Sequence, residues 1–235
     1  MGRPGVAEAV RRAPVDHIPA VGATVTLAPA EAHHLLVVCR HPRGGPVVVF
    51  DGGGREADAR LIDGVGTLEI VSEPRALPSP PALHLVLGVP KGPALDAALR
   101  MAVEVGATSV HPVTTERSVP KGERPDRWMR ILVGAAQQCG RADVPELAPL
   151  APLLEAIDRL DPSLDRRVAA PGAPDGPRAT GPAAVAIGPE GGWSTRELDA
   201  LLARGWTPLG LGEHVLRVDT AVAVGLAAVV ARPRP

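Results

Sequence analysis

A glycine-rich corner near the carboxyl end of the chain carries residues that could bind a small ligand. The stretch VAIGPEGGWSTREL (185–198) runs from a short apolar segment through the corner into a predicted helix. Ser194 and Glu197, three residues apart, form a capping box that fixes the start of this helix just after the glycines. The corner therefore directs backbone N–H groups towards a ligand above the carboxyl edge of a sheet.

Glu190, in the middle of this corner, argues against a polyphosphate ligand. A carboxylate about 4 Å from a phosphate charge would cost roughly 1 kcal/mol in water and about 4 kcal/mol at an effective dielectric constant of 20. The corner also lacks the GxGxxG spacing and the GK[ST] ending of the common nucleotide-binding fingerprints. A plain strand-to-helix turn, with Glu190 solvated or capping the helix, is the alternative for this stretch alone.

A second segment, PLGLGEHVLRVDTAVAVGLAAVV (208–230), repeats this design. It contains a strand, a glycine corner, the apolar pair Val215–Leu216, and Asp219 or Thr220 as the expected N-cap of a helix of small residues. Two such corners on neighbouring strands could form one cleft. Because neither corner carries a lysine, this cleft would suit adenosine bearing a short amino acid and a sulfonium better than a phosphate chain.

The elements that position the corners alternate between strands and helices after a proline-rich linker. The linker SEPRALPSPP (72–81) holds four prolines in ten residues. Strands are expected at 83–89, 108–113, 167–170, 184–187 and 206–211, and helices at 93–106, 126–140, 152–160, 194–204 and 220–231. This alternation predicts an α/β fold with a mostly parallel sheet, preceded by a small β-rich domain.

Composition and charge narrow the function classes. The 235 residues are 45% hydrophobic and carry a net charge of −1, so any nucleic-acid binding must come from a local basic patch. The two cysteines form no CxxC pair, no His, Cys and carboxylate set has metal-ligand spacing, and no metal is expected. The longest uncharged apolar run, 221–231, is short of the roughly 20 residues that span a bilayer. A soluble, cytoplasmic protein without a membrane association is expected.

The paired motifs IGPEGGWSTREL and LGLGEHVLRVDTA resemble the cofactor loops of the SPOUT class of S-adenosylmethionine-dependent RNA methyltransferases. Within that class the chain is most similar to the RsmE family, which methylates uridine N3 in 16S ribosomal RNA. The similarity extends to AEAHHLLVVCR (30–40), VVVFDGGG (47–54), residues 89–118 and GAAQQCGRADVP (134–145). The chain departs from the family pattern at Met101, Gly134, Gln137, Cys139 and Asp219. Charges are lost at Met101 and Gly134.

The resemblance implies a SPOUT-type parallel sheet over residues 82–235 that ends in a trefoil knot, and a PUA-like β-barrel over 1–73 that binds RNA. It implies a homodimer that acts on ribosomal RNA or on the assembled small ribosomal subunit. It places S-adenosyl-L-methionine in the knot, against Thr114, Thr115, Ile187, Gly188, Pro189, Glu190, Gly191, Leu209, Leu211, Gly212, Val215 and Leu216.

Methylation of uridine N3 needs the imide proton to leave, and a cation near the flanking carbonyl oxygens would stabilise the developing anion. Arg217 is the candidate for this cation, because it follows Val215–Leu216 and precedes the helix cap. Glu190 could orient the base or accept the proton. A surface Arg217 paired with Asp219, and a purely structural Glu190, are the alternatives.

Residues 117–141 hold six Lys or Arg against two acids and form the expected RNA-binding patch. Arg130, Gln137 and Arg141, spaced 7 and 4 apart, are expected on one helix face, and Arg117 and Arg40 are further RNA-binding candidates. Two other function classes stay open. One is a nucleotide-dependent enzyme on a doubly wound sheet, and the other is an RNA-binding protein without methyltransferase activity.

Overall fold

The computed structural model describes residues 10–118, 124–174, 176, 179 and 181–230. The chain divides into two units, one formed by residues 1–79 with 136–144 and the other by residues 80–135 with 145–235. Residues 136–144, which fall inside the expected range 82–235, group with the amino-terminal unit. Lys121, a member of the expected basic patch, lies outside the described residues.

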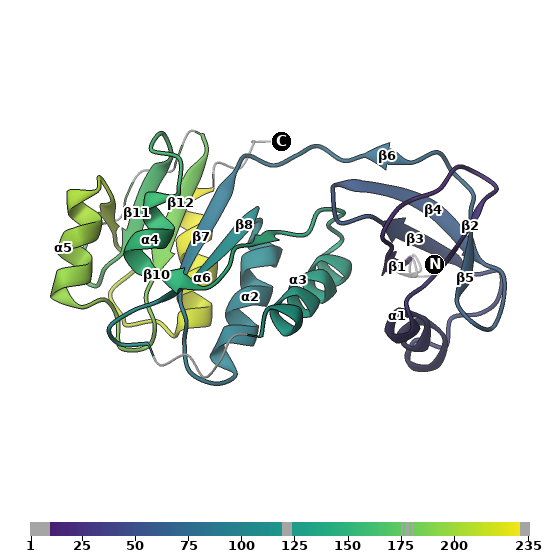
Figure 1. Ribbon diagram of the computed structural model, residues 1–235, viewed down its shortest axis with the longest axis horizontal. Helices are drawn as coiled ribbons and strands as arrows, with labels where there is room; N and C mark the ends of the chain where they lie inside the picture. The colour runs from purple at the N-terminus through teal and green to yellow at the C-terminus, as the bar shows by residue number, and fades with distance from the viewer. Residues whose placement is uncertain (1–9, 119–123, 175, 177–178, 180, 231–235) are drawn as a thin grey trace, which may run out of the picture. The chain divides into compact units, whose positions relative to one another are not determined.

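The amino-terminal unit is built on a mixed sheet in the order β1-β3-β4-β5-β2, with β6 paired to β4 (Figure 1). β1 runs parallel to β3, and the other pairs are antiparallel. Buried alternate residues of β3 and β4 form its core with Ala32 and Leu35 of the helical segment 29–38. The elements are β1 (Arg11–Pro14), β2 (Thr24–Thr26), α1 (Pro29–His33), a π-helical turn (His34–Val38), β3 (Pro46–Phe50), β4 (Arg55–Leu61), β5 (Thr67–Ile70) and β6 (Arg75–Ala76).

The carboxyl-terminal unit is a seven-stranded sheet in the order β10-β8-β7-β12-β11-β13, with β9 beside β8. All of these pairs are parallel, so the predicted α/β fold with a parallel sheet is confirmed. The strands are β7 (Leu83–Gly88), β8 (Ser109–Thr114), β9 (Glu146–Leu147), β10 (Ala151–Pro152), β11 (Asp165–Ala169), β12 (Ala183–Ile187) and β13 (Thr207–Leu209). The helices are α2 (Ala94–Val105), α3 (Pro125–Cys139), α4 (Leu153–Asp158), α5 (Thr195–Ala203) and α6 (Val218–Val229).

The central strand β12 is buried on both faces, which explains its unbroken apolar sequence. Ala184 and Ala186 join the core formed with α4 and with Leu201 of α5. On the opposite face α6 packs against β12 and against α2. A Cβ atom at Gly225 of α6 would lie 3.0 Å from Cδ1 of Ile187, so this glycine lets the helix lie close to the strand.

Two helix ends differ from the predictions. The N-cap of α6 is Arg217 rather than Asp219 or Thr220, because the buried side chain of Val218 already belongs to the helix. Helix α3 ends at Cys139, where Gly140 takes a φ of 85° and Arg141 N–H donates to the carbonyl oxygen of Ala136. Arg141 therefore does not share a helix face with Arg130 and Gln137, and that prediction was wrong.

His84 and His111 meet at Ser109 near the amino ends of β7 and β8. Ser109 Oγ lies 2.6 Å from Nδ1 of His84 and 3.0 Å from Nε2 of His111, and the two ring nitrogens are 3.3 Å apart. Burial lowers the pKa of His84, and it lowers the pKa of His111 to about 4, with a further contribution from the charge on His84. The folded protein therefore favours two neutral imidazoles here.

We expect the free energy of unfolding to fall as the pH drops from about 6.5 to about 4. The pKa of His111 in the folded state, about 4, lies below its unfolded value of 6.5, so its contribution is complete above pH 6.5 and is lost on acidification. The loss attributable to His111, discounted for its partial exposure, is about 1–2 kcal/mol. Urea unfolding of wild type and His111→Gln across this range measures it. An equal pH dependence in the two proteins contradicts the assignment, and His17→Gln, at an exposed histidine, is the control.

Candidate functional site

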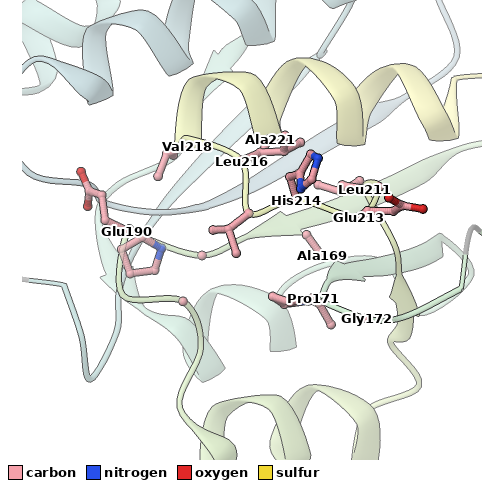
Figure 2. Close-up of a pocket in the computed structure, with 16 residues that line it drawn as sticks. Ala169, Pro171, Gly172, Glu190, Leu211, Glu213, His214, Leu216, Val218 and Ala221 are labelled. Carbon is pink, nitrogen blue, oxygen red and sulfur yellow. The ribbon is translucent and has the colours of Figure 1, made fainter.

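A cavity of about 150 Å³ lies at the carboxyl edge of the sheet, where the loops after β11, β12 and β13 meet (Figure 2). Seven of the twelve expected cofactor-binding residues line it: Gly188, Pro189, Glu190, Leu211, Gly212, Val215 and Leu216. Ile187 and Leu209 are buried at the ends of β12 and β13, directly before the lining loops. Thr114, Thr115 and Gly191 do not line it.

The loop after β11 also lines the cavity, through Ala170, Pro171 and Gly172, and no function was predicted for it from the sequence. The remaining lining residues are Ala169, at the end of β11, and Gly192, Glu213, His214, Val218 and Ala221. The sequence feature that could have identified this loop as part of the site is a short strand followed by Pro-Gly. That feature points to the cavity only when the strand order is known to place β11 between β12 and β13, and hydrophobic periodicity does not give strand order.

Two glycines make the close approaches of these loops possible. Gly192 takes a φ of 67°, a left-handed conformation that favours glycine, and its N–H closes the corner by donating to the carbonyl oxygen of Pro189 at 2.8 Å. Gly210 N–H donates to the carbonyl oxygen of Pro174 at 2.9 Å. A Cβ atom at Gly210 would lie 2.1 Å from the carbonyl oxygen of Ala173, so no larger residue fits without moving backbone.

Glu197 fixes the position of the corner after β12. The predicted capping box is confirmed: Glu197 N–H donates to Ser194 Oγ at 3.2 Å, and Ser194 N–H donates to Glu197 Oε2 at 2.8 Å. The other carboxylate oxygen accepts the N–H of Glu116, in the loop after β8, at 2.8 Å. Because Glu197 is 8% exposed, these bonds are shielded from water and join the two loops firmly.

Arg117, an expected RNA contact, packs against the same corner. Its Nη1 donates to the carbonyl oxygen of Gly191 at 2.7 Å, and a Cβ atom at Gly191 would lie 3.1 Å from Cβ of Arg117. The guanidinium therefore supports the corner after β12 in this structure. Glycine at position 191 leaves room for that contact.

The Glu190 carboxylate also holds a neighbouring loop. Both of its oxygens accept the N–H of Lys91, in the loop after β7, at 3.1 and 3.2 Å. Figure 2 shows the carboxylate directed away from the other lining residues. This arrangement matches the structural alternative for Glu190 and does not place its carboxylate as a proton acceptor.

Arg217, the expected catalytic cation, does not line the cavity. Its side chain is 83% exposed, and its Nε lies 3.9 Å from Oδ1 of Asp219. That separation is at the outer limit of an ion pair, and such exposed pairs contribute little stability. The guanidinium thus projects into solvent from the loop that lines the cavity.

The remaining RNA-binding candidates fall into two groups. Arg130 and Arg40 are exposed, and Arg40 is held at a φ of 49° after the π-helical turn. Gln137 instead donates its side-chain amide to the carbonyl oxygen of Arg12 at 2.6 Å, and Arg141 Nε donates to Asp143 Oδ1 at 3.1 Å. Gln137 and Arg141 are therefore engaged within the amino-terminal unit.

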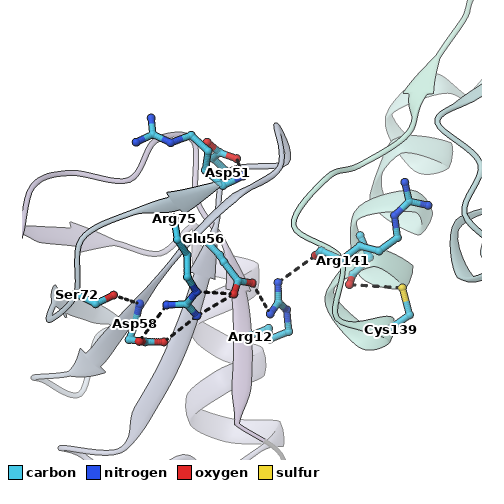
Figure 3. A network of polar contacts seen from close by, with 10 residues as sticks. Arg12, Asp51, Glu56, Asp58, Ser72, Arg75, Cys139 and Arg141 are labelled. Carbon is cyan, nitrogen blue, oxygen red and sulfur yellow. Dashed lines mark hydrogen bonds and ion pairs between the residues drawn. The ribbon is translucent and has the colours of Figure 1, made fainter. Parts of the chain in front are cut away.

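Arg12 explains why residues 136–144 group with that unit (Figure 3). Its guanidinium donates to the carbonyl oxygen of Arg141 at 3.1 Å and pairs with the carboxylate of Glu56 at 2.9 Å. The side chains of Arg12 and Glu56 are only 15% and 9% exposed, so removing Glu56 would leave the Arg12 guanidinium as a buried charge, whereas Glu56 also pairs with Arg75 at 2.8 Å. Arg12 also lies over the Phe50 ring, 5.3 Å from its centroid.

The cavity offers backbone N–H and C=O groups, apolar side chains and the side chains of Glu190, Glu213 and His214, and its lining contains no Lys or Arg. This lining fits an adenosine with a cationic amino-acid tail and does not favour a polyphosphate. Within the described ranges no group of three His, Cys, Asp or Glu side chains could hold a metal ion. None of the helices in the same ranges is long and apolar enough to cross a membrane.

We expect Glu197→Gln to lower the free energy of unfolding by about 2 kcal/mol, because an amide cannot accept both backbone N–H groups. Urea denaturation measures the change. Arg196→Ala is the matched control on the same helical turn, since the Arg196 side chain is 90% exposed and 3.8 Å from Glu116. Its change should stay within about 0.5 kcal/mol. Equal effects of the two substitutions would show that the carboxylate does not hold the loops.

Comparison with known proteins finds relatives that are RNA methyltransferases. The family model of the RNA methyltransferase domain matches residues 77–230. A ribosomal RNA small subunit methyltransferase E from Synechocystis sp. is 36% identical, over 88% of this chain and 73% of its own length. The protein of the same name from Bacillus subtilis is 28% identical, over 88% of this chain and 89% of its own length.

A solved structure shares the fold as well. It is a ribosomal RNA small subunit methyltransferase E from Neisseria gonorrhoeae bound to S-adenosyl methionine, with a TM-score of 0.85 and 27% identity. The match covers 93% of this chain and 96% of that one. With the family model matched over residues 77–230, and a relative 36% identical over most of both lengths, this chain belongs to the ribosomal RNA small subunit methyltransferase E family.

Proposed function

We propose that this protein transfers the methyl group of S-adenosyl-L-methionine to N3 of a uridine in small-subunit ribosomal RNA. The observation that carries the proposal is the cavity at the carboxyl edge of the sheet, lined by both glycine corners in a chain of this family. The Neisseria gonorrhoeae relative is bound to S-adenosyl methionine, which matches the chemistry of this lining. Action on ribosomal RNA or the assembled small subunit makes the protein cytoplasmic.

The cofactor supplies an activated methyl group on a sulfonium. The loops after β11, β12 and β13 bind it through backbone groups, and Leu211, Val215 and Leu216 supply apolar walls. Ile187 and Leu209 support these loops from below, and Gly191 keeps its place through the contact with Arg117. Thr114 and Thr115 do not line the cavity. They directly precede Glu116, whose N–H donates to Glu197 and so connects their loop to the corner after β12.

Arg217 stabilises the negative charge that develops on the uracil carbonyl oxygens as the N3 proton leaves. Its exposure in the single chain leaves the guanidinium accessible to an RNA base. The uridine must leave its stack to reach the cavity, at a cost of a few kcal/mol. Arg40, Arg130 and the amino-terminal unit, as a PUA-like barrel, supply RNA contacts that offset this cost.

The trefoil knot is part of the proposal. The segment after β13 lies against the loop after β11, since Gly210 N–H donates to the carbonyl oxygen of Pro174 at 2.9 Å. The same loop meets the end of α6, where Ala179 N–H donates to the carbonyl oxygen of Val229 at 3.1 Å. These contacts are those expected if the last segment threads that loop.

A homodimer completes the proposal. Helix α6 has one charged residue in its twelve, and Val224 on its outer side is 38% exposed. A helix that is apolar all round is normally buried, so a second copy is the expected cover. The exposed loop at Val215, which is 86% exposed, would then be closed by the partner.

The direct test combines binding and product analysis. Calorimetry should detect binding of S-adenosyl-L-methionine and its demethylated product, because the cavity recognises the parts that they share. Small subunits purified from cells lacking the gene are incubated with the protein and S-adenosyl-L-methionine. Mass spectrometry of their ribosomal RNA should then show one added methyl group, on N3 of a uridine. Cofactor binding without methyl transfer would favour a catalytically silent RNA-binding protein. Tight NADH binding without cofactor binding would favour a nucleotide-dependent enzyme.

Arg217→Ala should lower kcat by about 100-fold, the size typical of removing one transition-state charge contact. Cofactor affinity by calorimetry should be unchanged, because the side chain does not line the cavity. Arg217→Lys, which keeps the positive charge, should recover part of the rate. Sedimentation velocity of each variant checks that assembly is intact. Full activity in Arg217→Ala would leave Arg217 without a catalytic role.

A further inference from the structure

The methyl transfer proposed above needs a group that takes the N3 proton, and we infer that His214 is that group. This inference rests on the proposed function. His214 belongs to the loop after β13, which lines the cavity, and it is exposed. It was not among the residues singled out from the sequence.

Elimination among the lining residues points to His214. Three lining side chains can exchange a proton: Glu190, Glu213 and His214. Both oxygens of Glu190 accept the N–H of Lys91, and Figure 2 shows that carboxylate directed away from the cavity. The same view shows the Glu213 carboxylate directed away from the ring of His214.

The surroundings of His214 suit a base that meets a nucleobase. Figure 2 shows the ring among Leu211, Leu216 and Ala221, on the side of the cavity covered by α6. The other charged groups of this loop and of the first turn of α6 are Glu213, Arg217 and Asp219. The Arg217 guanidinium, two peptide units beyond Val215, is available to the carbonyl oxygens while the imidazole takes the proton.

Imidazole is the side chain best matched to this task at neutral pH. An unprotonated imidazole is a stronger base than a carboxylate, and it is the side chain that most often serves as a general base. General bases of this kind contribute about 100-fold to 10,000-fold to rate.

The step balances without another reactant. The N3–H bond of the uridine breaks, and its proton passes to the unprotonated ring nitrogen of His214. The N3 electron pair forms the bond to the methyl carbon, and the carbon–sulfur bond breaks with its electron pair kept by sulfur. The exposed imidazolium then returns its proton to water, which resets the base.

The decisive experiment is a pH–rate profile of the full-length protein with small ribosomal subunits. His214→Gln and His214→Ala should lower kcat at pH 7 by about 100-fold or more. The wild-type kcat should rise with pH as an imidazole loses its proton, and this rise should be absent from both variants. The deficit should shrink at alkaline pH, where solution hydroxide ionises the imide. His17→Gln, the same change at an exposed histidine of the amino-terminal unit, should keep wild-type kcat.

A second readout separates chemistry from binding. Calorimetry with the demethylated cofactor product, S-adenosylhomocysteine, should give affinities within about threefold of wild type for both variants, because removing a base affects the transition state and not ground-state binding. A kcat within about threefold of wild type overturns the inference, since a general base contributes far more. A loss of kcat that is equal at every pH and is accompanied by weaker binding also overturns it, because it shows a structural role. No methyl transfer by wild type would refute the proposed function instead.

Discussion

The buried carboxylate of Glu197 is the interaction on which the site depends. It accepts N–H groups from Ser194, at the start of α5, and from Glu116, in the loop after β8. The first bond fixes where the helix begins, and so fixes the end of the glycine corner. The second makes the corner's position depend on the neighbouring strand. Both bonds are local in space, yet 81 residues separate Glu116 from Glu197, so the corner is set by the tertiary fold.

Glu190 extends the same principle to the loop after β7. Its carboxylate accepts the Lys91 N–H, so the two acids of the motif are used to hold backbone rather than to face the ligand. The Glu190 carboxylate is turned away from the cavity, whose walls are otherwise main-chain polar groups, apolar side chains, Glu213 and His214. A negative charge at its rim opposes a phosphate chain and tolerates a sulfonium, which answers why a glutamate stands in a corner that otherwise looks suited to a nucleotide.

Features set by nearby residues could be predicted from the sequence. Helix α2 buries Leu95, Ala98, Leu99 and Ala102 as its periodicity predicts, and the capping box at Ser194 forms as its spacing predicts. Features set by distant partners could not. Residues 136–144 group with the amino-terminal unit because Arg12, which pairs with Glu56, donates to the carbonyl oxygen of Arg141. The loop after β11 joins the cavity only through strand order. Neither contact is visible in a local pattern.

The loop after β13 is the part of the site that the single chain leaves open. Val215 lines the cavity while 86% exposed, and Arg217 beside it is 83% exposed. An apolar side chain gains roughly 1.5–3 kcal/mol when it moves from water into a buried environment. A surface that covers this loop therefore gains affinity from Val215 and charge complementarity from Arg217. In the proposed function, substrate RNA and a second copy of the chain would each supply one of these, and closing the cavity by both would couple assembly to methyl transfer.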